Sequence, residues 1–226
     1  MIPIRDHNPS NSKPVVTYML IAVNVAIFAY MIFLPDGALL RFINTYSLRP
    51  YDLTTGQGLY TIITAMFLHG SLGHIFGNML FLNIFGDNLE ATLGRFRYLI
   101  FYLICGIAAA LGQTLVDPFS TVPNLGASGA IAGIMGGYLY LFPRNRVDIL
   151  FPVGFFPFIF SVPAYTMILF WFVAQLLSGV GQIFIPEGGG IAYFAHLGGF
   201  LTGLLLVALL KSLRQTRPSG YRLVGS

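Results

Sequence analysis

Residues 125–142 have the sequence LGASGAIAGIMGGYLYLF, and this stretch decides the fold class of the chain. It lies inside a longer window, residues 118–143, that contains no Asp, Glu, Lys or Arg. A helix needs about 20 mostly apolar residues to cross the hydrocarbon core of a bilayer. The window therefore predicts a membrane-spanning helix that has Ser128 near its beginning.

The rest of the chain repeats this pattern. Of its 226 residues, 56% are hydrophobic and only 9% are charged, whereas a soluble globular domain carries about 25% charged residues. We therefore expect an all-α membrane protein in which six transmembrane helices form one bundle. The predicted helices are Val15–Leu34, Ile62–Phe85, Tyr98–Val116, Leu125–Phe142, Val162–Ile185 and Ile191–Leu210.

These helices predict a single membrane domain for the whole chain, with a core at residues 15–210 and polar tails at residues 1–14 and 211–226. The segment Asp36–Leu59 mixes aromatic and polar residues, so we expect it to lie along the membrane interface. The segment Ile149–Ser161 is interrupted by prolines, and we interpret it as an interfacial or re-entrant loop.

Positively charged residues predict the orientation of the bundle. With six spans and a cytoplasmic N-terminus, ten Lys and Arg residues lie on the cytoplasmic side and only two, Arg41 and Arg49, lie outside. Such an excess is typical of cytoplasmic loops, so both termini are predicted to be cytoplasmic. A seventh span would move four C-terminal charges outside. The net charge of +4 therefore indicates membrane topology rather than a nucleic-acid partner.

Polar side chains inside membrane spans are costly and therefore mark function. In the six-span arrangement, three different helices bring His74 with Asn78, Ser128, and His196 to one level just below the outer surface. Chance would scatter such groups over both leaflets, so their common depth indicates a site. Other polar side chains in or beside the spans are His69, Asn83 and Gln175.

Ser128 and His196 have the chemistry of a nucleophile and its base. Ser128 lies at a helix N-terminus, where free backbone N–H groups can stabilise an oxyanion. His196 can take a serine proton and return it to a leaving amine. Gly129 and Gly199 begin glycine-lined faces that would let the two helices approach closely. Helix packing for the serine and an interhelical hydrogen bond for the histidine are the alternatives.

The eight acidic residues all lie in loops or at helix ends, so no carboxylate is available at this depth. This favours a Ser–His dyad over a Ser–His–Asp triad, and it argues against a proton-coupled transporter. His74 and Asn78 share one helical face and could donate to an oxyanion, or simply to a neighbouring helix. His69 lies off that face, which suggests that it fixes a loop. No metal-binding motif is present.

Three motifs in this order resemble the signature of the rhomboid family of intramembrane serine proteases. They are HGSLGHIFGN at residues 69–78, GASG at residues 126–129 and AHLGG at residues 195–199. The sequence EATLG at residues 90–94 is also similar to a motif of that family. The resemblance covers residues 15–210.

The resemblance implies a six-helix bundle with a water-accessible cavity that opens to the outer side. It makes Ser128 the nucleophile and His196 the base, with His74, Asn78 and the Ser128 amide as the oxyanion hole. The substrates would be transmembrane proteins with one span, cut near its outer end, and no cofactor is implied. Supporting residues would be His69, Glu90, Gly126, Gly129 and Gly199.

Two positions depart from the family pattern. Many relatives have a Trp-Arg pair where this chain has Gly58-Leu59 after Gln57, and many have Tyr where this chain has Ala132. The anchoring of the first loop and the group that orients His196 are therefore left open. An inactive rhomboid-like binding protein and a small-molecule transporter are the alternatives. Without an organelle-targeting extension in the sequence, we expect a prokaryotic plasma membrane, with the site facing its outer side.

Overall fold

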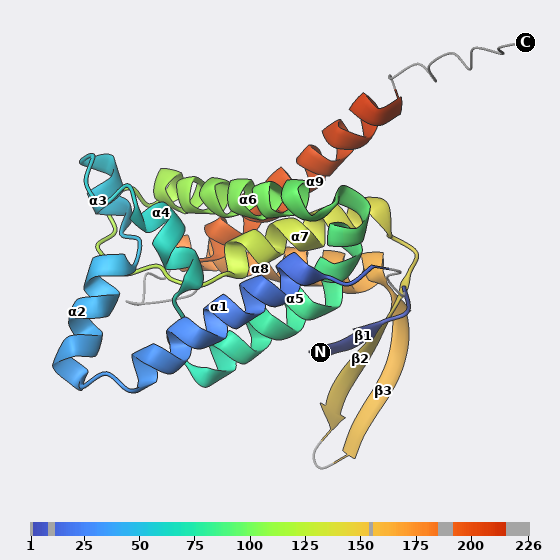
Figure 1. The fold of residues 1–226 in the computed structure, drawn as a ribbon, viewed down its shortest axis with the longest axis horizontal. Helices are drawn as coiled ribbons and strands as arrows, with labels where there is room; N and C mark the ends of the chain where they lie inside the picture. Colours follow the sequence, from blue (N-terminus) through green and yellow to red (C-terminus); the bar gives the residue numbers. More distant parts are fainter. Residues whose placement is uncertain (1, 9–11, 154–155, 185–191, 216–226) are drawn as a thin grey trace, which may run out of the picture.

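The chain is mostly helical, with a small sheet at one end (Figure 1). The computed structural model describes residues 2–8, 12–153, 156–184 and 192–215. In chain order the described elements are β1 (Ile2–Asp6), α1 (Val15–Ile32), α2 (Asp36–Tyr46), α3 (Pro50–Thr54), α4 (Thr61–Thr64), a 3₁₀ turn (Ala65–Phe67), α5 (Leu72–Leu93), α6 (Arg95–Val116), α7 (Ser128–Leu141), β2 (Arg146–Val153), β3 (Phe156–Pro163), α8 (Ala164–Phe184) and α9 (Tyr193–Gln215).

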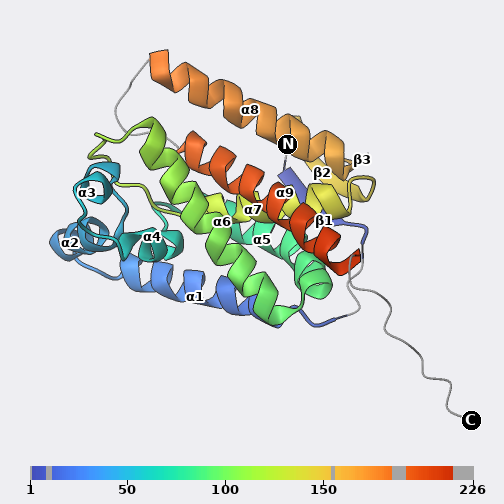
Figure 2. The ribbon, with the colours of Figure 1, turned by 90° about the horizontal axis from the view of Figure 1, so that it is seen from above.

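Among the described residues, four helices are long and apolar enough to cross a membrane, namely α1, α6, α8 and α9. A fifth span results if the bent segment from α4 to α5 is counted as one, and α7 is a shorter apolar helix of 14 residues. Figure 2 shows α8 along one edge of the bundle and α1 along the opposite edge. The structure thus supports a helical membrane protein, while the six-span plan and the side of the termini stay predictions.

Most predicted helices are present with boundaries shifted by a few residues, although Ile185 and Ile191 lie outside the described residues. The prediction of one helix over Ile62–Phe85 is wrong. The chain bends there by 95° between residues 61–67 and 72–93. The first segment ends where the backbone of Leu68 becomes extended. Ser71 begins the next helix, because its side chain accepts a hydrogen bond from the backbone N–H of His74.

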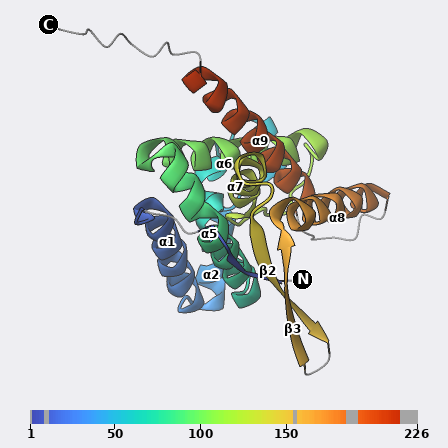
Figure 3. The ribbon, with the colours of Figure 1, turned by 90° about the vertical axis from the view of Figure 1, so that its right-hand side faces the viewer.

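The segment Ile149–Ser161, predicted as an interfacial or re-entrant loop, is instead part of two strands, so an all-α fold is incomplete. Its place relative to the membrane stays a prediction. Residues 146–163 form an antiparallel hairpin, and β1 from the predicted polar tail adds a third strand in the order β1-β2-β3. Aromatic and β-branched residues in this stretch favour strands. Pro152 is tolerated because β1 pairs only with Val147–Leu150, which leaves Pro152 on an edge of β2. The hairpin projects away from the helices (Figures 1 and 3).

Asp148 on β2 ties the sheet together. Its Oδ2 accepts a hydrogen bond from Arg5 at 2.7 Å. Its Oδ1 accepts one from the Ser161 hydroxyl and lies 2.7 Å from a ring nitrogen of His7. These contacts, with that from Ser161 the largest, hold the pKa of the Asp148 carboxyl well below its ordinary value. The N-terminal segment is therefore fixed by both backbone pairing and charge.

Candidate active site

Ser128 and His196 lie against each other. Ser128 is the first residue of α7, and His196 lies in the first turn of α9. The distance between Oγ of Ser128 and Nε2 of His196 is 2.8 Å, which is hydrogen-bond distance. His196 is only 8% exposed, so the contact is shielded from the surroundings of the bundle.

Glycines bring the two helices this close. A Cβ atom added at Gly199 would overlap the carbonyl oxygen of Gly129, and one added at Gly203 would overlap that of Gly133. The backbones of α7 and α9 are therefore in direct contact, as the glycine-lined faces predict. Near the end of α7 the closest approach shifts by one residue, because Gly136 lies against the α9 backbone and Gly137 lies close to side chains of three neighbouring helices.

A cavity of about 540 Å³ lies beside this pair. Its lining is mostly apolar and includes Phe81, Ile131 and Met135. None of the described residues that line it is an Asp, Glu, Lys or Arg. The polar side chains that line it are those of His74, Asn78, Asn124, Ser128 and His196, with the ring of Trp171 beside them.

The first turns of α5 place His74 and Asn78 on the cavity wall. Asn78 is 8% exposed, and its Nδ2 has no hydrogen-bond partner among the described residues. The His74 ring lies over the chain just before the serine. Gly126 permits this, because its φ of +133° suits glycine and an added Cβ would be 2.8 Å from the ring.

None of the five predicted supporting residues is among the described residues that line the cavity, and two of them have clear contacts elsewhere. His69 is buried, and its ring contacts that of His74 edge-on with centroids 5.0 Å apart. Glu90 lies at the other end of α5, where its carboxylate accepts hydrogen bonds from the backbone N–H groups of Val16 and Thr17 at 2.9 and 2.8 Å. A carboxylate at a helix N-terminus stabilises that end, so Glu90 fastens α1 to α5.

Sequence reasoning did not assign a partner to the second ring nitrogen of His196, and the structure gives one. Nδ1 of His196 lies 2.6 Å from Oε1 of Gln175 on α8. The Trp171 ring, one turn earlier on α8, lies 5.8 Å from the imidazole with an interplanar angle of 37°. The polar character of Gln175 inside a span was the available signal. Ala132, where many relatives have Tyr, also lines the cavity.

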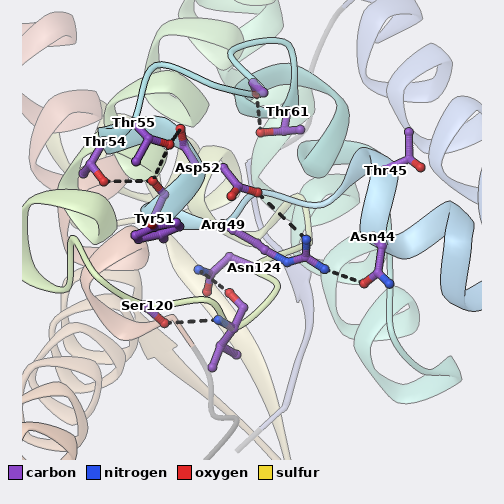
Figure 4. Close-up of polar contacts among 12 residues, drawn as sticks. Asn44, Thr45, Arg49, Tyr51, Asp52, Thr54, Thr55, Thr61, Ser120 and Asn124 are labelled. Atoms are coloured by element: carbon purple, nitrogen blue, oxygen red, sulfur yellow. Dashed lines mark hydrogen bonds and ion pairs between the residues drawn. The ribbon is translucent and has the colours of Figure 1, made fainter.

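The first loop is anchored without a Trp-Arg pair. Figure 4 shows Arg49 reaching both Asn44, at 2.5 Å, and Asp52. Elsewhere in the same loop, the Tyr60 hydroxyl donates to the carbonyl of Thr45 at 2.9 Å. These contacts hold the loop against itself.

The loop is also joined to the segment that leads into the serine. Leu48 and Asn124 exchange two backbone hydrogen bonds of 2.9 and 2.7 Å. Nearer the serine, the backbone N–H of Gly126 donates to the carbonyl of Ala65 at 2.8 Å. The backbone before Ser128 is therefore held by hydrogen bonds from two sides.

Comparison with known proteins assigns the chain to a family. The rhomboid-domain family model matches residues 56–213, which include the cavity. The mitochondrial rhomboid protein 1 of Saccharomyces cerevisiae is 32% identical over 193 residues, which cover 83% of this chain and 51% of the relative. Rhomboid protease GluP of Bacillus subtilis is 26% identical over 200 residues, covering 88% of this chain and 36% of the relative.

A chloroplastic relative from Arabidopsis thaliana, rhomboid-like protein 11, is 31% identical over 161 residues, covering 67% of this chain and 52% of the relative. The chain thus spans about half the length of these curated relatives, or less. Because the family model matches more than half of the chain, the chain belongs to the rhomboid family.

Proposed function

We propose that the chain is an intramembrane serine endopeptidase that uses Ser128 as nucleophile and His196 as general base. The observation that carries the proposal is the 2.8 Å hydrogen bond between the two side chains beside a cavity. The similarity to rhomboid protease GluP of Bacillus subtilis supports proteolysis as the reaction. A dyad rather than a triad with a carboxylate agrees with the absence of acidic residues from the described cavity lining.

The reaction begins when Nε2 of His196 takes the hydroxyl proton and Oγ of Ser128 attacks the scissile carbonyl carbon. The resulting tetrahedral oxyanion would be held by His74, Asn78 and the backbone N–H of Ser128. The unpartnered Nδ2 of Asn78 supports its role, since it needs no other bond to be broken first. The backbone N–H of Ser128 belongs to the first turn of α7, where N–H groups lack intrahelical acceptors.

Collapse of this intermediate breaks the C–N bond, and His196 gives its proton to the leaving amine. A water molecule, deprotonated by the same imidazole, then attacks the acyl-enzyme ester. This second step releases the carboxyl product and returns the proton to Oγ of Ser128. No other reactant is needed.

The substrates proposed are transmembrane proteins with one span, cut near its outer end. We place the chain in the plasma membrane of a prokaryote as one membrane domain with core residues 15–210, with six spans that include α7 and with both termini in the cytoplasm. The excess of Lys and Arg in the segments assigned to the cytoplasm supports this orientation. It puts Ser128 near the outer surface, because α7 would then begin on that side.

The test is cleavage of a single-span reporter protein by purified protein in liposomes. Ser128→Ala and His196→Ala should each lower the cleavage rate by about 10⁴-fold or more, with thermal unfolding midpoints close to the wild type. Ser120→Ala, which removes a hydroxyl from the loop before α7, is the matched control and should cleave normally. Cleavage that survives in Ser128→Ala would overturn the nucleophile. A folded wild-type protein that cleaves none of several reporters would favour an inactive membrane-protein binder.

A further inference from the structure

The second nitrogen of the His196 ring is the feature that the dyad leaves unused. We propose that Gln175 is a positioning residue that fixes the tautomer and orientation of His196, so that the site works as a Ser–His–Gln arrangement. This inference rests on the proposed protease function. It deepens that function by naming the group that prepares the base.

The tautomer proposed for His196 follows from this contact. Oε1 of Gln175 is an amide oxygen that accepts hydrogen bonds, and it lies 2.6 Å from Nδ1 of His196. Nδ1 therefore carries the proton in the neutral ring, and Nε2 presents its lone pair. Since Nε2 faces Oγ of Ser128 at 2.8 Å, this is the tautomer that a general base requires.

The orientation has a second support from the same helix. Trp171 and Gln175 are four residues apart on α8 and so share one face. The Trp171 ring lies beside the imidazole at 5.8 Å, while the Gln175 amide meets its edge. The buried Nδ1–H would otherwise lack an acceptor, which costs free energy in an apolar environment.

The residues around His196 explain why an amide, and not a carboxylate, orients it. The described residues that line the cavity include Ser128, His74 and His196 itself, but no carboxylate. An amide accepts from Nδ1–H in both protonation states of the ring, but it adds no negative charge. It therefore fixes geometry with less stabilisation of the imidazolium than the aspartate of a Ser–His–Asp triad provides.

The first test compares two substitutions in the cleavage assay. Gln175→Met keeps the length of the side chain but removes the strong acceptor, and it should lower kcat by roughly 10- to 100-fold with KM little changed. Gln175→Glu keeps an acceptor, so it should recover most of the rate. Its negative charge favours the imidazolium, and the acidic limb of the pH–rate profile should move about one unit or more to higher pH.

The matched control is Gln113→Leu. Oε1 of Gln113 on α6 accepts from the backbone N–H of Ala195, next to the histidine, at 3.3 Å. The Gln113→Leu substitution removes a glutamine that binds the start of α9 without touching the imidazole. This variant should keep the pH–rate profile of the wild type. Equal losses of kcat in Gln175→Met and Gln113→Leu, or a Gln175→Met protein with wild-type kcat and pH profile, would overturn the positioning role.

A second measurement does not depend on cleavage. Nitrogen-15 NMR of protein labelled in its four histidine rings distinguishes the Nδ1–H tautomer from the Nε2–H tautomer. The His196 signal, assigned through His196→Ala, should show Nδ1–H in the wild type and lose that preference in Gln175→Met. A wild-type ring with Nε2–H would overturn the inference even in an active protease. Absence of cleavage with the expected tautomer would instead remove the proposed function and leave the contact intact.

Discussion

Two buried asparagines on α5 differ in how many hydrogen bonds their side chains make. Asn78, near the start of the helix, lines the cavity, and its Nδ2 has no partner among the described residues. Asn88, near the other end, donates to Asp6 and Asp87 at 2.8 Å each and accepts from Asn8 at 2.6 Å. Both are buried, at 8% and 3% exposure.

The difference separates two uses of a buried amide. An amide whose donor and acceptor atoms are all hydrogen-bonded, such as that of Asn88, stabilises one arrangement of the chain. Breaking that arrangement would leave its partners without hydrogen bonds, which costs free energy. An amide with a free donor beside a cavity keeps that donor for a group that arrives later. The same contrast separates the two ends of the molecule. At the end that holds the sheet, the carboxylates of Asp148 and Glu90 accept hydrogen bonds, whereas at the site one donor, Nδ2 of Asn78, has no partner among the described residues.

Within this comparison of the two asparagines, the largest effect is expected when the unpartnered donor of Asn78 is removed. Asn78→Ala should lower the rate of reporter cleavage by roughly 10²-fold, since one of the proposed oxyanion donors is lost while His74 and the Ser128 amide remain. Its unfolding midpoint should stay near that of the wild type, because Nδ2 of Asn78 holds nothing in the described structure. If Asn78→Ala instead unfolds at a lower temperature and cleaves normally per folded molecule, Asn78 is a structural residue like Asn88 and the distinction between them is wrong.

An intermediate effect, on stability rather than turnover, is expected at the other asparagine. Asn88→Ala should lower the free energy of unfolding by about 1–3 kcal/mol, because the half-buried carboxylate of Asp6 loses a donor. Cleavage per folded molecule should be unchanged. Thermal unfolding in detergent, measured beside the reporter assay, checks both parts. A large loss of turnover would show that the sheet end also governs the site.

The smallest effect should depend on pH. The pKa of Asp148 is lowered in the fold, so its contribution to stability is present above the ordinary carboxyl pKa of about 4 and is lost as the pH falls through the lower value of the folded state. Asp148→Asn should therefore unfold at a lower temperature than the wild type at pH 7. Its midpoint should approach that of the wild type as the pH is lowered below about 4. A constant difference between the two proteins at every pH would contradict the ionic role of this residue.

Long apolar windows predicted most of the helices because hydrocarbon admits few other structures. The bend before α5 was not predicted, since Ile62–Phe85 contains no Asp, Glu, Lys or Arg and resembles one long span. The Ser71 side chain starts a new helix inside it. The sheet was missed for a different reason. The strand β1 is only five residues long and contains a proline, and it becomes a strand because β2 supplies its hydrogen-bond partners.

The site divides in the same way. The pairing of Ser128 with His196 could be anticipated, because each residue lies near the start of a predicted span and glycines follow on both helices. The partner of Nδ1 could not be, since a sequence does not show how far α8 is rotated about its axis relative to α9. That rotation decides whether Gln175 or a neighbouring side chain meets the imidazole.

The cavity has a consequence for the supply of a reactant. Hydrolysis consumes one water molecule for every bond cut, and the hydrocarbon core of a bilayer contains almost none. The cavity of about 540 Å³ beside Ser128 and His196 is therefore the space that would supply water to the proposed reaction. A substrate segment that entered would displace water from it. The protein would therefore have to exclude water for binding and readmit it for deacylation, so turnover should depend on how fast this small reservoir refills.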